Sequence, residues 1–173
     1  MKEKNNDPHG IQKLWAPWRM EYIDGIEMDK KEVCIFCEKP AENEDEKNFI
    51  VYRGKTCFII LNKYPYNNGH LMVVPYKHTS ELADLDSETK LELMNLIELT
   101  MKAIRNVMRP DGFNVGINFG RTAGAGITSH LHIHIVPRWN GDTNFMPIIG
   151  SAKIISEALA DTYKKLKNAF ENI

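Results

Sequence analysis

The residues of this chain that could carry chemistry are concentrated between positions 130 and 136, which read His-Leu-His-Ile-His-Ile-Val. In an extended strand alternate side chains share a face, so the three imidazoles line one face at intervals of roughly 6.6–6.8 Å. A neutral imidazole can act as a nucleophile or donate a hydrogen bond to phosphate. Ordinary surface histidines would show the same alternation, but Thr, Lys or Glu would serve there equally well. We therefore interpret the three histidines as a functional site.

A glycine-rich segment, residues 120–126, leads directly into the histidines. Gly120, Gly124 and Gly126 permit close approach of backbone N–H groups to an anion. Asn118 adds a side-chain amide at the end of the preceding predicted strand. A glycine-rich turn alone is usually just a turn. Because this one runs into the histidines, we expect both to converge on one phosphate group.

Two cysteines, Cys34 and Cys37, have the spacing that lets two thiolates reach one metal ion. His78, just beyond a predicted strand, is a candidate for a further ligand. A redox pair and two unrelated thiols are the alternatives, although the βαβ context of a thioredoxin-like motif is missing. The third cysteine, Cys57, lies in an apolar run and is expected in the core.

These groups need a scaffold, and the chain predicts one of the α+β class: an antiparallel sheet of about five strands with one long helix and a C-terminal helix. Runs of β-branched and aromatic residues between turn residues are typical of strands. Gly54-Lys55 separates the first two runs and indicates a hairpin. The expected strands span residues 49–53, 56–61, 70–75, 113–119 and 130–136.

Two helices are expected to cover this sheet. The long one begins at Asp86 or Ser87, whose side chains can cap a helix, and ends at Pro110. Apolar residues recur in it at spacings of three and four, which predicts one buried face. A closing helix is predicted over residues 151–170, and the acidic segment 38–48 is expected to be a solvated loop. The predicted buried stripes are Met94, Ile97, Met101, Ile104 and Met108 in the long helix, and Ile155, Leu159, Thr162 and Leu166 in the closing helix.

Length and composition limit the possible functions. The 173 residues, of which 43% are hydrophobic, suffice for a single domain, expected over residues 14–173 after a flexible tail at 1–13. The net charge of −1 argues against a protein that coats nucleic acid. Apolar runs are far shorter than the roughly 18 residues of a membrane span, and the N-terminus lacks a signal core. We therefore expect a cytoplasmic protein without nucleic-acid or membrane partners.

These motifs resemble the histidine triad (HIT) superfamily of nucleotidyl hydrolases and transferases. Its pattern His-φ-His-φ-His-φ-φ, with φ apolar, is matched at every position of residues 130–136. Asn62 precedes the segment 69–75 at the family's spacing. The resemblance implies a HIT-like fold, a nucleotide substrate and a homodimer formed through the long helix and a neighbouring strand. Similarity to the bacterial diadenosine tetraphosphate phosphorylases, also called ATP adenylyltransferases, and to the fragile-histidine-triad hydrolases extends over residues 112–118, 130–139 and Asn144-Phe145.

The resemblance also implies roles for individual residues. His132 would be the nucleophile that forms a covalent nucleotidyl intermediate, and His134 would bind non-bridging phosphate oxygens. His70 would orient the triad, although a satisfied core histidine is the alternative. Some members carry Ser or Thr five residues before the nucleophile, where this chain has Ile127. The remaining implied substrate-binding residues are Asn62 for the ribose, Asn118, Gly124 and Gly126 for the phosphate, and Thr128 or Ser129 as the hydroxyl near it.

A structural zinc site is implied as well. The zinc-binding branch of the family and the related galactose-1-phosphate uridylyltransferases use a cysteine pair, a histidine after a strand and the first triad histidine. The resemblance maps this set onto Cys34, Cys37, His78 and His130. A Cys₂His₂ set is closed and four-coordinate, so the zinc ion would be structural.

Three functions are compatible with these motifs. The first is cleavage of diadenosine polyphosphates through a nucleotidyl-histidine, with phosphate or water as the second acceptor; the similarity favours phosphate. The second is hydrolysis of nucleoside phosphoramidates, which requires proton delivery to the leaving nitrogen. The third is a zinc-stapled nucleotide-binding module without catalysis, in which His132→Ala would leave no activity to lose.

Overall fold

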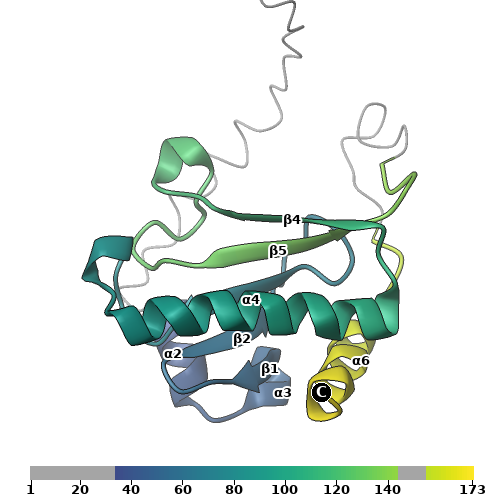
Figure 1. The fold of residues 1–173 in the computed structure, drawn as a ribbon, viewed down its shortest axis with the longest axis horizontal. Coiled ribbons are helices and arrows are strands. Elements are labelled where there is room, and N and C mark those ends of the chain that lie inside the picture. The colour runs from purple at the N-terminus through teal and green to yellow at the C-terminus, as the bar shows by residue number, and fades with distance from the viewer. Residues whose placement is uncertain (1–33, 144–154) are drawn as a thin grey trace, which may run out of the picture. The chain divides into compact units, whose positions relative to one another are not determined.

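The computed structural model describes residues 34–143 and 155–173. The expectations for the tail at 1–13 and for Asn144-Phe145 fall outside these residues. Within them, five strands form one antiparallel sheet in the order β1-β2-β3-β5-β4 (Figure 1). The predicted α+β class with a five-stranded antiparallel sheet is confirmed. The strands are β1 (Ile50–Arg53), β2 (Cys57–Leu61), β3 (Leu71–Pro75), β4 (Gly112–Ile117) and β5 (Ile133–Arg138).

The first hairpin is held by a side chain of the long helix. β1 and β2 pair antiparallel, as predicted, with Gly54 and Lys55 in the connection. The carboxylate of Glu92 accepts hydrogen bonds from the backbone N–H groups of Lys55 (2.7 Å) and Thr56 (2.5 Å). A Cβ atom at Gly54 would lie 2.5 Å from Glu92 Oε1, so any larger residue would displace this carboxylate from the turn.

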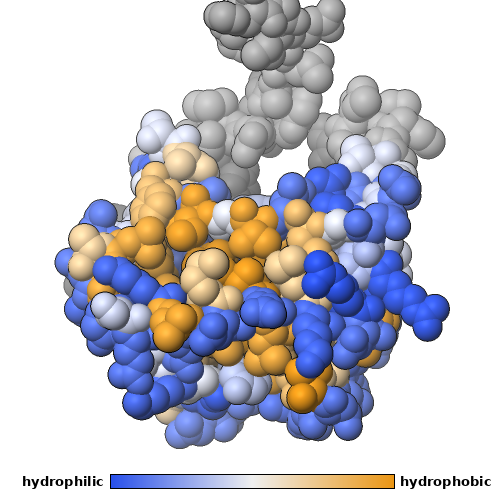
Figure 2. Space-filling view, viewed as in Figure 1, coloured by the Kyte–Doolittle hydropathy of each residue, from blue (hydrophilic) through white to orange (hydrophobic). Residues whose placement is uncertain are grey.

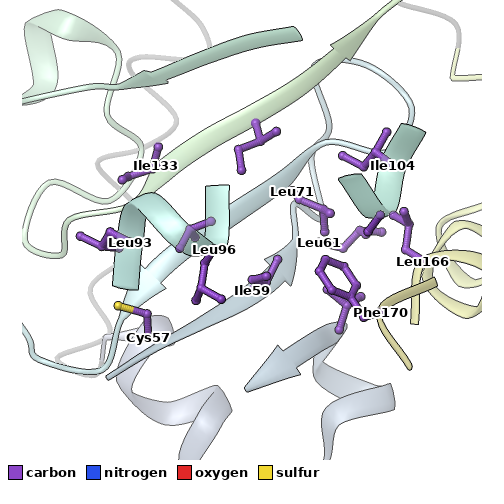
Figure 3. Close-up of a cluster of buried hydrophobic side chains, with 14 of the residues drawn as sticks. Cys57, Ile59, Leu61, Leu71, Leu93, Leu96, Ile104, Ile133, Leu166 and Phe170 are labelled. Atoms are coloured by element: carbon purple, nitrogen blue, oxygen red, sulfur yellow. The ribbon is translucent and has the colours of Figure 1, made fainter. Parts of the chain in front are cut away.

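The long helix, α4 (Ser87–Met108), covers one face of the sheet (Figure 1). Asp86 caps it, because its carboxylate accepts a hydrogen bond from the backbone N–H of Thr89 at 2.7 Å. Side chains of α4, of the sheet and of α6 (Leu159–Glu171) together form the main hydrophobic core (Figure 3). Among the described helices, none has the length and apolar character needed to cross a membrane. The core includes Cys57, Ile59, Leu71, Leu93, Leu96, Ile104, Ile133 and Leu166.

The buried face of α4 differs from the predicted one. Leu93, Leu96 and Thr100 are buried, whereas Met94 is 63% exposed. At about 100° per residue, the predicted stripe is centred roughly a quarter turn from the buried face. The buried face includes the small residues Thr100 and Ala103. The side chains that meet the sheet are therefore smaller on average than those of the predicted stripe. Of the predicted stripe, Ile104 is buried, and Ile97, Met101 and Met108 are half-buried.

β5 begins at Ile133, three residues later than predicted. The pair Val73–Ile133 is the last one between β3 and β5. Beyond it, Pro75 has no N–H to donate, and its carbonyl accepts a hydrogen bond from His130 Nε2 at 2.9 Å. An imidazole therefore occupies the acceptor that a backbone ladder would use, and His130 and His132 precede the paired part of the strand.

The acidic segment 38–48 is largely helical rather than a loop. It contains most of α2 (Ile35–Ala41) and all of α3 (Asp45–Asn48). Arg53 on β1 binds the Asp45 carboxylate at 2.7 Å and the Pro40 carbonyl at 2.9 Å. Asn48 Nδ2 donates to the Lys39 carbonyl at 3.3 Å. The Arg53 contacts from the sheet edge and the Asn48 contact between the two helices stabilise helical turns that the local sequence alone does not specify.

The closing helix, α6, begins at Leu159, later than predicted. The predicted start at residues 151–154 lies outside the described residues, and residues 155–158 are not helical. The carboxylate of Glu157 accepts hydrogen bonds from Thr162 Oγ1 (2.7 Å) and Asn68 Nδ2 (3.3 Å). Glu157 thus bonds the first turn of α6 and the loop that contains Asn68, and the chain before Leu159 does not continue the helix. Of the predicted inner stripe, Thr162 and Leu166 are buried, Leu159 is half-buried and Ile155 precedes the helix.

Candidate functional site

His132 is buried, and its proton position follows from one backbone contact. Its Nδ1 lies 2.9 Å from the carbonyl oxygen of His130, an acceptor only, so Nδ1 carries the hydrogen. The neutral ring then has a lone pair on Nε2. Burial lowers the pKa of His132, which favours this neutral form. The ring packs against Phe36 of α2, with centroids 5.1 Å apart. The geometry supplies an unprotonated imidazole nitrogen in a restricted orientation.

His70 and His134 form a second, directly bonded pair. The backbone N–H of Tyr66 donates to His70 Nδ1 at 3.1 Å, so this nitrogen is an acceptor and the His70 proton lies on Nε2. His70 Nε2 is 2.9 Å from His134 Nδ1, which must then accept. The His134 proton is left on Nε2. The row of contacts therefore gives His134 a donor N–H on the ring side opposite His70.

Both imidazoles of this pair are held neutral. Burial, with smaller effects from His134 and His132, lowers the pKa of His70 to about 3. Burial and the neighbouring His132 lower the pKa of His134 to about 4. The rings of His132 and His134 meet edge to face, with centroids 4.8 Å apart. Within residues 34–143 and 155–173, the site thus combines one free lone pair with one free N–H on adjacent rings at neutral pH.

The predicted phosphate loop connects β4 to β5 beside these rings. Ile117 pairs with Ile133, so Asn118 follows β4 at the level of His132. Its side-chain amide donates to the Gly124 carbonyl at 3.4 Å and so helps to close the loop. Gly120 and Gly124 have φ of 77° and 90°, a region that side chains disfavour. Gly126, Thr128 and Ser129 are exposed.

Asn62, the predicted ribose ligand, lies at the start of the loop that ends at His70. Its Nδ2 is 3.3 Å from His70 Nδ1, and its Oδ1 accepts from the backbone N–H of Tyr64 at 2.9 Å. Two features of this region escaped the sequence analysis. The only sequence feature that points to Phe36 is its position between the two cysteines. The Tyr66 N–H cannot be recognised from sequence, because every residue except proline has a backbone N–H.

The four predicted metal ligands come together at the N-terminal end of α2. The ligand atoms of Cys34, Cys37, His78 and His130 all lie within 4.8 Å of one another. Nδ1 of His130 is 3.3 Å from Nδ1 of His78 and 3.3 Å from Sγ of Cys34, and Cys37 Sγ is 3.3 Å from His78 Nδ1 and 3.6 Å from His130 Nδ1. A tetrahedral zinc ion would separate two nitrogens by about 3.3 Å and sulfur from nitrogen by about 3.6 Å. The residues present fit such an ion.

One further observation favours a metal over a redox pair. His130 Nε2 is occupied by the Pro75 carbonyl, which leaves the Nδ1 lone pair directed at the cysteines. Cys57 is separate from this cluster and buried in the core, as predicted.

Comparison with known proteins agrees with this geometry. The profile of the HIT domain matches residues 43–141. A Mycobacterium tuberculosis protein named AP-4-A phosphorylase is 46% identical over 163 residues, which cover 90% of this chain and 83% of that protein. A protein of Sulfolobus tokodaii named as a hypothetical histidine triad nucleotide-binding protein has a similar structure, with a TM-score of 0.64, 32% identity and coverage of 80% of this chain and 93% of that one. A zinc-bound histidine triad family protein from Mycobacterium smegmatis has a TM-score of 0.65, 26% identity and coverage of 80% and 94%.

The lowered pKa of His134 predicts a pH-dependent stability. Between pH 6.5, its ordinary pKa, and pH 4, roughly its pKa in the folded chain, His134 is protonated in the unfolded chain and neutral in the folded one. Stability is therefore fully present above pH 6.5 and falls as the pH drops toward 4, by about 1.4 kcal/mol per pH unit for this ring. Denaturant unfolding of the native chain and of His134→Gln across this range should show a shallower slope in the variant. Equal slopes would mean that His134 is not held neutral by the fold.

Proposed function

The chain belongs to the HIT family, and from this premise we propose that it cleaves diadenosine polyphosphates through a covalent nucleotidyl-His132 intermediate. The similarity to a protein named AP-4-A phosphorylase supports a nucleotide-processing enzyme. The observation that carries the finer proposal is the fixed pair of proton positions: the His132 Nδ1 contact with the His130 carbonyl, and the His70–His134 contact. Together they place an imidazole lone pair next to an imidazole N–H.

In the first step the Nε2 lone pair of His132 attacks the α-phosphorus. A P–N bond forms, the bond from phosphorus to the bridging oxygen breaks, and the polyphosphate leaves with that bond's electrons. For diadenosine tetraphosphate the leaving group is ATP, which is a stable anion without an added proton, so a strong general acid is not needed. His134 Nε2–H donates to a non-bridging oxygen, and Asn118 with the backbone of Gly124 and Gly126 surrounds the developing charge. Asn62 binds the ribose, and Thr128 is a further phosphate contact.

In the second step an acceptor attacks the same phosphorus and releases His132. Inorganic phosphate gives ADP, and the reaction is a phosphorolysis; water gives AMP, and it is a hydrolysis. The 46% identity to the protein named AP-4-A phosphorylase supports phosphate as the acceptor. Neither step consumes the His132 Nδ1 proton, which stays on Nδ1 and is donated to the His130 carbonyl throughout.

We further propose that Cys34, Cys37, His78 and His130 hold a structural zinc ion. With all four positions filled by protein, the ion would cross-link α2 to the segments after β3 and before β5, and would take no part in bond making. Phe36, which lies between the cysteines, contacts the His132 ring. The ion would thereby stabilise the wall against which the nucleophile rests.

We also propose a homodimer in which α4 and β4 face a second copy. Figure 2 shows hydrophobic side chains gathered over these two elements. β4 is the last strand of the sheet, pairs with β5 alone among the described strands, and exposes Val115 by 44%. The α4 flank that is turned away from the core exposes Met94 by 63%. An unpaired strand edge beside an apolar helix flank is a surface that a second copy could cover.

The activity is tested by product analysis with diadenosine tetraphosphate, with and without inorganic phosphate. We expect sustained formation of ATP and ADP only with phosphate, about one equivalent of ATP per chain without an acceptor, and a protein-bound AMP group after alkaline quenching, since the P–N bond of a nucleotidyl-histidine is labile in acid. His132→Ala should reduce turnover by on the order of 10³-fold or more, since the attacking atom is removed. ATP and AMP without phosphate would identify a hydrolase. Symmetric ADP pairs would contradict attack at the α-phosphorus, and a lack of turnover would direct the assay to nucleoside phosphoramidates.

The metal proposal predicts about one zinc ion per chain by elemental mass spectrometry. Cys37→Ala should bind little zinc and melt at a lower temperature, because one ligand of four is lost. Cys57→Ala is the matched control, since that thiol lies in the core away from the cluster, and it should retain the metal. A native protein without zinc, or full zinc content in Cys37→Ala, would rule out this site.

The dimer proposal predicts that Met94→Glu dissociates the protein. An unpaired carboxylate buried in the interface is strongly unfavourable, so the dissociation constant should rise at least about tenfold. The adjacent Asn95→Glu points a quarter turn away on the same helix and should leave the dimer intact. Sedimentation of the two variants across a concentration series makes the comparison. A native monomer, or equal behaviour of both variants, would exclude this interface.

A further inference from the structure

The loop that ends at His70 is tied to the strand that carries His134. Within this 62–70 loop, the Asn67 side chain is buried. Its Nδ2 donates to the Pro137 carbonyl at 3.0 Å and to Asp142 Oδ2 at 2.8 Å. Pro137 is three residues beyond His134 on β5. One amide group therefore sets the position of the loop relative to the histidine strand.

Asp142 holds that amide from beyond the end of β5. Its side chain is only 6% exposed and also accepts hydrogen bonds from Arg138 Nε (2.6 Å), Arg138 Nη2 (2.8 Å) and the backbone N–H of Trp139 (3.1 Å). The Arg138 contacts hold the pKa of Asp142 far below its usual range, so it is a fixed negative acceptor. It lies one residue outside the segment that matches the HIT domain profile.

The clamp acts on the atoms that fix the His70 proton. The Asn67 carbonyl accepts the backbone N–H of His70 at 3.2 Å, and the preceding residue, Tyr66, supplies the N–H that bonds His70 Nδ1. If the loop shifted along β5, His70 Nδ1 would lose this donor and keep only the longer contact with Asn62 Nδ2 at 3.3 Å. Rotation of the Asn62 amide would present Oδ1 instead, and His70 could then carry its proton on Nδ1. His70 Nε2 would then accept from His134 Nδ1, and His134 would present a lone pair outward. Both arrangements satisfy the His70–His134 contact, so that contact alone cannot choose between them.

We propose that Asp142 and Asn67 are positioning residues that keep the His134 proton on Nε2. The consequence for catalysis rests on the proposed function, because only an outward N–H can bind a phosphate oxygen, whereas an outward lone pair repels it. Neither residue contacts the reacting atoms. They act through the Tyr66 N–H, then His70, and then His134. The contacts that select the His134 tautomer are therefore those between Asn67 and the end of β5.

The neighbouring Asn68 provides a matched control. Its amide donates to Glu157 at 3.3 Å, and its Oδ1 accepts from Thr162 Oγ1 at 3.1 Å. It anchors the same loop by the same number of contacts, but to α6 and the segment before it, which carry no histidine. Asn68→Ala should therefore weaken the loop without changing its position relative to β5.

The test compares Asn67→Ala with Asn68→Ala in the full-length, metal-loaded protein with ¹⁵N-labelled histidine. Ring nitrogen shifts distinguish a protonated from a bare Nδ1 in each neutral imidazole. We expect the native His134 tautomer, Nε2–H, to persist in Asn68→Ala and to be replaced in part by Nδ1–H in Asn67→Ala. Turnover in Asn67→Ala should fall about tenfold or more, a loss typical of a partner that orients an active group.

Asp142→Asn preserves side-chain volume and provides the measurement if Asn67→Ala does not fold; it should show the same mixed tautomers. An unchanged His134 tautomer in a folded clamp variant, or an equal change in Asn68→Ala, would overturn the proposal. The nitrogen shifts need no substrate. A protein inactive on diadenosine polyphosphates would therefore refute the proposed function while this comparison still decides the role of the clamp.

Discussion

A row of buried imidazoles is useful only if each ring keeps its single proton on a defined nitrogen. Here both ends of the row are fixed by the backbone: the His130 carbonyl accepts a hydrogen bond from His132 Nδ1–H, and the Tyr66 N–H donates to Nδ1 of His70. Backbone groups do not titrate, so the carbonyl and the N–H that hold the two end rings keep the same charge at every pH. Burial does the rest by making the charged form of each ring unfavourable. The reactivity of the site therefore depends on where the main chain runs.

The interruption of the sheet after Val73–Ile133 is what brings the main chain into that position. With Pro75 unable to extend the ladder, His130 bonds its carbonyl and turns Nδ1 toward Cys34 and Cys37. The carbonyl of the same residue accepts the hydrogen bond that orients the His132 ring. The Cys/His cluster and the histidine row thus both arise from one local irregularity, in which side-chain hydrogen bonds substitute for strand pairing.

The sequence predicted what local periodicity determines and missed what tertiary contacts determine. The alternation of histidines, the hairpin at Gly54 and the Asp86 cap all depend on residues close together in the chain. The face of α4 was wrong because this helix has two apolar faces, and spacing cannot say which one meets the sheet. The helices within 38–48 depend on Arg53, which the segment itself does not contain. Side-chain placement by the Tyr66 N–H and by Asn67 and Asp142 has no sequence pattern, since it depends on loop geometry.

The position of His130 has a consequence for genetics. Its imidazole closes the strand end and joins the cysteine cluster, while its carbonyl orients His132. A substitution there would disturb the strand end, the cysteine cluster and the orientation of His132 together, so its effect would not identify which of the three was responsible. A substitution at position 132 is easier to interpret, because it leaves the His130 contacts at the strand end and with the cysteines in place. Effects on the proposed reaction are therefore better assigned from alleles of position 132 than from alleles of position 130.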